Sequence, residues 1–104
     1  MTDCKIRNAD LDSLLDAVVT LETREEAYRL FEDLCTAAEL SAMAQRFRLA
    51  VMLRNKATHQ QIVEQTGSST ATVARVSRCL RHGAGGYALV MDRRERVERT
   101  DGAE

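Results

Sequence analysis

Hydrophobic residues recur along most of this chain every three or four positions, the spacing of amphipathic α-helices. The first such stretch predicts a helix with apolar residues at positions 11, 14, 15, 18 and 19. A second helix is predicted from Thr23, because Thr23 and Glu26 have the spacing of a capping box, and its inward face is Ala27, Leu30, Phe31 and Leu34.

These two helices are amphipathic and precede the rest of the predicted fold, an arrangement that often supplies a dimer interface. The alternative is that they cover only their own core. We favour the dimer, since a chain of 104 residues is short for burying a deep core alone. The expected interface residues are Leu11, Leu14, Leu15, Val18, Leu30, Phe31 and Leu34.

A longer third helix is predicted from Thr36 to about Asn55, because Thr36 and Glu39 repeat the capping-box pattern. Its predicted inward residues are Leu40, Met43, Phe47, Ala50 and Leu53. Its predicted outer residues are Gln45, Arg46, Arg48 and Arg54. A glycine-rich turn at residues 83–86 precedes a last helix, which begins with Tyr87, Leu89, Val90 and Met91.

Residues 58–80, which lie between the long third helix and the glycine-rich turn, have the pattern of a helix-turn-helix. Thr58 can cap a short helix that carries Ile62 and Val63 inward, and Gly67 can adopt the positive φ that ends it. Ser68 or Ser69 then caps a second helix over residues 70–82. In that helix the inward stripe is Val73, Val76 and Leu80, and the outer face is Thr70, Ala74, Ser77, Arg78 and Arg81.

The outer face of the second helix is small and hydroxylic at its start and basic towards its end. Such a face suits the DNA major groove, with small residues near base edges and cations near phosphates. A plain helical hairpin with a solvated face is the alternative. The predicted DNA-binding residues are Thr58, His59, Gln60, Ser68, Ser69, Thr70, Ala71, Ala74, Arg75, Arg78 and Arg81.

The net charge of −1 conceals a strong asymmetry along the chain. Residues 1–40 hold 4 basic and 10 acidic side chains, a net charge of −6, whereas residues 41–94 hold 9 basic and 2 acidic ones, a net charge of +7. The last ten residues carry −2. The basic part contains the helix-turn-helix, which is where a polyanion would dock, although ordinary solvated charge would give the same count.

The other classes of protein receive little support. The three cysteines are widely spaced without a CxxC pair, which argues against a zinc site or a disulfide framework and for a reducing cytoplasm. No apolar run reaches membrane-spanning length, and the N-terminus lacks the apolar core of a signal peptide. His59 and His82 have no carboxylate or cysteine at a catalytic spacing, so we expect neither an enzyme nor a bound metal.

We therefore predict one all-α domain of about six helices over residues 9–99, with flexible ends at 1–8 and 100–104. Its parts are the dimerisation helices, the long central helix, the helix-turn-helix and the C-terminal helix, at residues 9–35, 36–56, 58–82 and 86–99.

Residues 34–82 resemble the tryptophan repressor family, and residues 31–93 are similar to its YerC/YecD type. The resemblance rests on FEDLCT (31–36), AQR (44–46), GSSTATVARVSRCL (67–80) and GGYALVMDR (85–93). It implies an all-helical, intertwined homodimer whose second motif helix enters the major groove of double-stranded DNA. We expect a homodimeric, sequence-specific transcriptional regulator, most simply a repressor; a helical interaction module without DNA binding is the alternative.

The resemblance also implies a ligand pocket. Arg46 and Arg75 match the two arginines that enclose tryptophan in the tryptophan repressor, and Thr36 and Thr72 match two further polar residues. The pocket-floor glycine is replaced by Val76, which adds three carbons where the indole would lie. We therefore expect no cofactor and no tryptophan corepressor, and leave open whether another small molecule acts as an effector.

Overall fold

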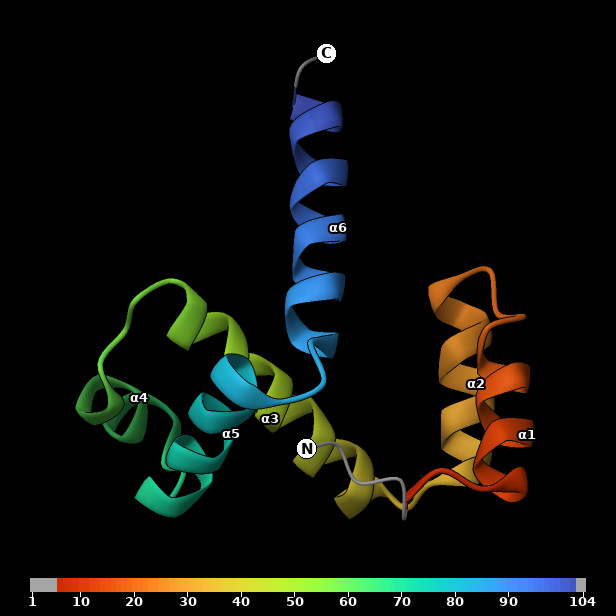
Figure 1. Cartoon of the computed structure of the whole chain (residues 1–104), viewed down its shortest axis with the longest axis horizontal. Coiled ribbons are helices and arrows are strands. Elements are labelled where there is room, and N and C mark those ends of the chain that lie inside the picture. The colour runs from red at the N-terminus through yellow and green to blue at the C-terminus, as the bar shows by residue number, and fades with distance from the viewer. Residues whose placement is uncertain (1–5, 103–104) are drawn as a thin grey trace. The chain divides into compact units, whose positions relative to one another are not determined.

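The computed structural model describes residues 6–102, with side chains described to residue 98. Within this range the chain forms six helices and no strand, which confirms the all-α prediction. Figure 1 labels them α1 (Ala9–Val18), α2 (Arg24–Leu34), α3 (Ala37–Arg54), α4 (His59–Thr66), α5 (Thr70–His82) and α6 (Gly86–Gly102). Helix α6 continues past residue 99, where the prediction ends it.

Parts of the predicted flexible ends, residues 1–5 and 103–104, lie outside the described residues, as does Cys4. Contacts within the chain group the residues into two compact units, residues 1–42 and 43–104. The single domain over residues 9–99 stays a prediction.

Side-chain caps define where the helices of the first unit begin. Asn8 Oδ1 accepts the backbone N–H of Leu11 at 2.8 Å at the start of α1, and Thr23 Oγ1 accepts that of Glu26 at 3.1 Å at the start of α2. At α3 the predicted capping box is present in full: Glu39 N–H donates to Thr36 Oγ1 at 3.1 Å, and Thr36 N–H donates to Glu39 Oε1 at 2.8 Å. These bonds satisfy helix N–H groups that have no partner in the preceding turn.

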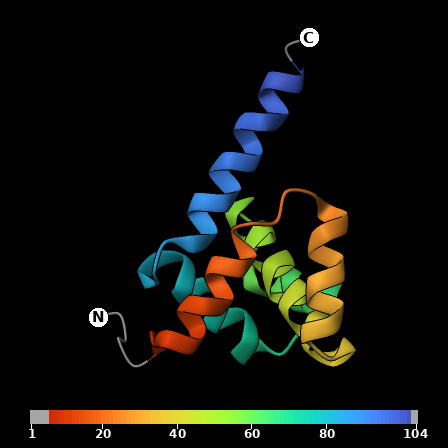
Figure 2. The same cartoon turned by 90° about the vertical axis from the view of Figure 1, so that its right-hand side faces the viewer.

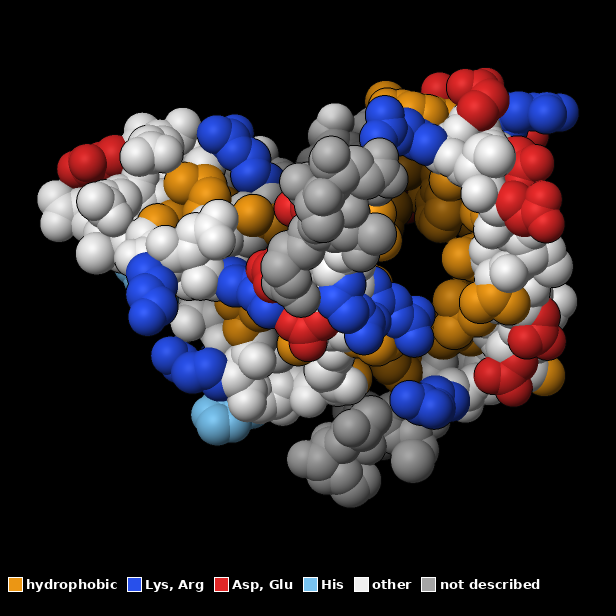
Figure 3. All heavy atoms as spheres, turned by 90° about the horizontal axis from the view of Figure 1, so that it is seen from above, with side chains coloured by type: hydrophobic (Ala, Val, Ile, Leu, Met, Phe, Trp, Pro, Cys, Tyr) orange, Lys and Arg blue, Asp and Glu red, His pale blue; other side chains and the backbone are white. Residues whose placement is uncertain are grey.

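Helices α1 and α2 contain no buried side chain. Leu14 and Val18 are half-buried, whereas Leu15 is 50% and Val19 79% exposed. In Figure 3 the acidic side chains of this unit lie along one edge and its hydrophobic side chains on the opposite side. These exposures show that the two helices have an apolar face that the unit itself leaves uncovered. Such a face is notable because burial of apolar surface is the main force that stabilises a fold.

The second unit has a buried core at the meeting point of its helices. Its buried side chains are Leu49 and Ala50 of α3, Ile62 of α4, Val73 and Val76 of α5, and Met91 of α6. The burial of Leu49 was not predicted from the sequence. Met43, in contrast, was predicted to face inward and is 36% exposed. The run from Leu49 to Leu53 is apolar at every position, so it favours no single inward stripe.

Helix α6 is attached to α3 through its first half. Besides Met91, the rings of Phe47 and Tyr87 lie 6.2 Å apart, and the guanidinium of Arg94 lies 5.7 Å from the centre of the Phe47 ring. Figures 1 and 2 both show the second half of α6 extending beyond α3, α4 and α5, and Val97 there is 60% exposed.

Candidate nucleic-acid interface

The first motif helix, α4, begins with a reciprocal capping box. Gln61 N–H donates to Thr58 Oγ1 at 3.1 Å, and Thr58 N–H donates to Gln61 Oε1 at 2.8 Å. Ile62 is completely buried and Val63 is half-buried, as the sequence predicts. The cap therefore fixes the start of α4 while Ile62 anchors it in the core.

The turn between α4 and α5 is built around Gly67, whose φ of +73° lies in the left-handed region. A Cβ at this position would meet no other atom within 4 Å, so the backbone conformation, rather than crowding, makes glycine suitable here. The chain leaves the turn at Ser69, whose Oγ accepts the N–H of Thr72 at 3.1 Å and caps α5. Of the two serines considered, Ser69 is the cap.

Helix α5 presents two different faces. Val73 and Val76 are buried at 0% and 1% exposure and fix the helix to the core. The predicted outer residues are exposed, with one exception: Ser77, expected on the outer face, is only 6% exposed. It follows Val76 directly, so the buried surface of α5 is wider than a single stripe of apolar residues indicates.

The structure leaves ten of the eleven predicted DNA-contacting residues at least partly accessible and brings them onto α4, α5 and the turn. The exposed ones are Thr58, His59, Gln60, Ser69, Thr70, Ala71, Ala74, Arg75, Arg78 and Arg81. Ser68 is the exception: it is 8% exposed, and its hydroxyl accepts a hydrogen bond from the Gln45 side chain. Ser68 is therefore not part of the exposed candidate surface, because its side chain is directed into the fold.

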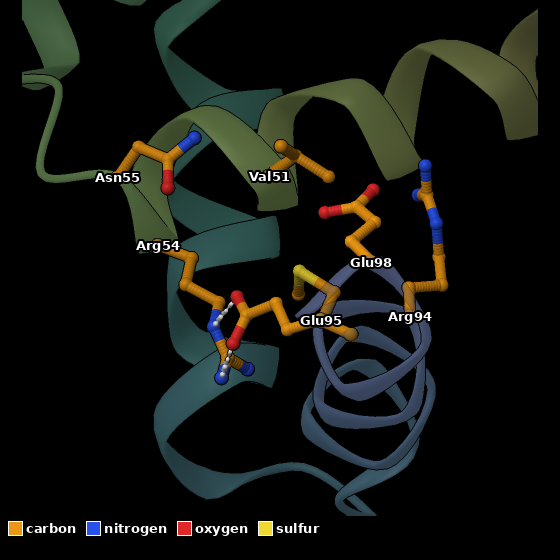
Figure 4. A pocket seen from close by; sticks show the side chains of 7 residues that line it. Val51, Arg54, Asn55, Arg94, Glu95 and Glu98 are labelled. Atoms are coloured by element: carbon orange, nitrogen blue, oxygen red, sulfur yellow. Dashed lines mark hydrogen bonds and ion pairs between the residues drawn. The ribbon is translucent and has the colours of Figure 1, made fainter. Parts of the chain in front are cut away.

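The arginines of the second unit differ in their partners. Arg54, predicted on the outer side of α3, forms an ion pair with Asp92. It forms a second ion pair with Glu95, at 3.2 Å, which Figure 4 shows. The hydrogen bond to Asp92 raises the pKa of Arg54 above its ordinary value. Among residues 6–98, no carboxylate pairs with Arg75, Arg78 or Arg81, so the cations of α5 remain available to an external anion.

Two residues with a structural role were missed by sequence reasoning, Gln45 as the partner of Ser68 and Arg54 as the partner of α6. Their partners lie 23 and 38 residues away in the chain, respectively, and no local pattern reports such pairings. The described residues also contain no group of His, Cys, Asp and Glu side chains that could hold a metal ion.

Three of the five residues of the ligand pocket that the resemblance implies have other roles in the structure. Thr36 caps α3, and Thr72 Oγ1 accepts the hydroxyl of Ser69 at 2.9 Å. Arg46 and Arg75 are exposed, and Val76 is part of the buried core. The position that the resemblance marks as the floor of a pocket is thus filled by a packed side chain.

None of the expected interface residues on α1 and α2 is buried in the single chain. Leu15 and Leu34 are exposed, and the other five are half-buried: Leu11, Leu14, Val18, Leu30 and Phe31. Along residues 6–102 no helix is long and apolar enough to cross a membrane.

Comparison with known proteins gives consistent results. The family model for the Trp repressor protein matches residues 9–95. An uncharacterised protein of Bacillus subtilis, YerC, is 44% identical over 94 residues, which is 90% of each chain. A candidate Trp repressor from Staphylococcus aureus superposes with a TM-score of 0.83 at 43% identity, covering 91% of this chain and 95% of its own. A TrpR-like protein from Eubacterium eligens gives 0.81 at 42% identity, covering 88% and 94%.

Proposed function

Because the chain belongs to the Trp repressor family, a family of DNA-binding regulators and not of enzymes, we propose that it is a sequence-specific transcriptional repressor that binds duplex DNA as a homodimer. In this proposal α5 enters the major groove. The N-terminus of α4 and the arginines of α5 contact the DNA backbone on either side.

The observation that best supports this role is the exposed face of α5. Its first residues, Thr70, Ala71 and Ala74, are small enough to let the helix approach base edges closely, and an alanine methyl can contact the methyl group of thymine. Arg78 and Arg81 follow towards the other end of the helix, and no carboxylate of residues 6–98 pairs with them. Phosphate contacts of that kind position a protein on DNA, and the base contacts specify the sequence.

The homodimer is proposed from the apolar surface that each unit leaves exposed. The helices α1 and α2 have no buried side chain. Within residues 43–104, an open hollow of about 350 Å³ is lined almost entirely by apolar groups, including Phe47, Tyr87 and Val90. A second copy of the chain would cover such surfaces, and its two-fold symmetry would provide a second recognition helix for a longer operator.

We propose that DNA binding needs no tryptophan corepressor. Val76 matches the pocket-floor glycine of the resembling repressor and is 1% exposed, so its side chain packs in the core where that repressor leaves room for an indole ring. The guanidinium groups of Arg46 and Arg75 are exposed and can stack on an aromatic ring, which is the reason to measure tryptophan binding directly.

The decisive experiment is binding-site selection from random duplex DNA with the purified protein, followed by a salt titration on the selected sequence. We expect one enriched two-fold symmetric sequence and a logarithmic affinity that falls linearly with the logarithm of salt concentration. A protein-interaction module would enrich no sequence. Arg78→Ala serves as the internal control, because it should reduce the salt dependence without changing the selected sequence.

A further inference from the structure

The turn of the helix-turn-helix is tied to α3 by a side-chain hydrogen bond. The amide nitrogen of Gln45, on α3, donates to the hydroxyl oxygen of Ser68. Ser68 is 8% exposed and Gln45 is half-buried, so water competes weakly for this bond. Without Gln45 the Ser68 hydroxyl would be largely buried and would lack this partner, which is costly.

A second set of hydrogen bonds joins the same turn to α4. The hydroxyl of Thr66 donates to the carbonyl of Ile62 at 2.7 Å and accepts the backbone N–H of Ser68 at 3.2 Å. Ser68 is therefore held by its backbone from α4 and by its side chain from α3. Gly67 lies between them in the left-handed conformation that the turn requires.

The position of Ser68 determines where α5 begins. The next residue, Ser69, is the N-cap of α5, and the exposed residues Thr70 and Ala71 follow at once. Holding Ser68 on α3 therefore holds the base-facing end of α5 at one place relative to the long helix. Recognition of base edges tolerates displacements of only about 0.5 Å, so small movements at this point matter for sequence-specific binding.

We propose that Gln45 is a positioning residue for DNA recognition. Through Ser68 it keeps α5 in its binding orientation without the help of a small-molecule effector. This inference rests on the proposed function and adds to it the means by which the recognition helix is fixed. Gln45 itself lies on α3 and need not touch the DNA.

The test compares Gln45→Ala, Ser68→Ala and the double variant on the selected duplex, by fluorescence anisotropy. Gln65→Ala is the matched control, because Gln65 is an exposed glutamine of α4. One hydrogen bond contributes about 1 kcal/mol, so we expect each single variant to bind the selected sequence about fivefold more weakly. The double variant should bind the selected duplex no more weakly than the single variant with the lower affinity, since each substitution removes the same hydrogen bond. Binding to unrelated duplexes should be unchanged.

Hydrogen exchange without DNA provides an independent measurement. In Gln45→Ala, but not in Gln65→Ala, the amides of residues 67–69 should exchange faster, and the melting temperature should fall by no more than about 4–8 °C, the shift expected for the loss of one hydrogen bond. The proposal is overturned if exchange in the turn is unaltered, or if the affinity losses of the single variants multiply in the double variant. If the wild type selects no DNA sequence, the proposed function fails, and the exchange measurement still decides whether Gln45 holds the turn.

Discussion

Replacing Val76 tests whether this position is a core residue or the floor of a ligand site. Val76 is 1% exposed and belongs to the cluster that contains Leu49, Ile62 and Val73. Val76→Ala removes two methyl groups, worth about 0.8 kcal/mol each in lost burial, and leaves a small cavity. We expect a loss of about 2–3 kcal/mol in the free energy of unfolding.

The assay is urea unfolding followed by circular dichroism, with Val97→Ala as the matched control. Val97 is 60% exposed on α6, so the same substitution should change the unfolding free energy by less than about 0.5 kcal/mol. Equal effects at the two positions would refute the assignment of Val76 to the core.

The same residue gives a prediction about tryptophan. Forcing additional groups into a packed site costs about 1–3 kcal/mol, and about 1.4 kcal/mol already changes affinity tenfold. We therefore expect calorimetry to show no saturable binding of L-tryptophan to the wild type, and DNA affinity to be independent of it. Micromolar binding with tighter DNA association would contradict the steric argument. Binding that appears only in Val76→Gly would support it directly.

Three further predictions address DNA binding, assembly and the turn. Arg78→Ala should weaken binding to all duplexes alike and reduce by about one the slope of log affinity against log salt concentration, whereas Thr70→Phe should change the selected sequence. Both expectations would be contradicted if the two variants retarded every duplex in the same way as the wild type. Leu14→Asp should abolish the dimer or the fold, because the charge would be buried without a partner, and sedimentation of a stable wild-type monomer at micromolar concentration would exclude this interface. Gly67→Ala should cost about 1 kcal/mol in urea unfolding through its positive φ alone, while Gly86→Ala, at the start of α6 with free space for a Cβ, should cost nothing.

Local features of the sequence were sufficient to predict the helices and their starting points. Thr23, Thr36 and Thr58 cap helices as expected, and Gly67 adopts the predicted positive φ. These features depend on residues at most four positions apart, because helix caps and turns are closed by short-range hydrogen bonds. The same holds for the stripe of Val73 and Val76, where a helical period alone identifies the buried side.

Burial in the apolar parts of the chain could be predicted only in part. Between Leu49 and Leu53 every residue is apolar, so only the packing of α4, α5 and α6 decides that Leu49 and Ala50 are the fully buried ones. Ser77 shows the reverse case, since a polar residue predicted to face solvent is covered by its surroundings. Residue type expresses a preference for burial, whereas neighbouring elements determine the outcome.

By itself the sequence determined that the chain is helical, where its helix-turn-helix lies, which face of α5 is basic, and to which family it belongs. Tertiary structure decided which polar side chains are available to a partner. It turned Ser68 inward to Gln45, paired Arg54 with Asp92 and Glu95, and left Arg75 and Arg78 without a carboxylate within residues 6–98. The physical reason is that hydrogen bonds and ion pairs between residues 23 to 41 positions apart form only after packing has brought the helices together.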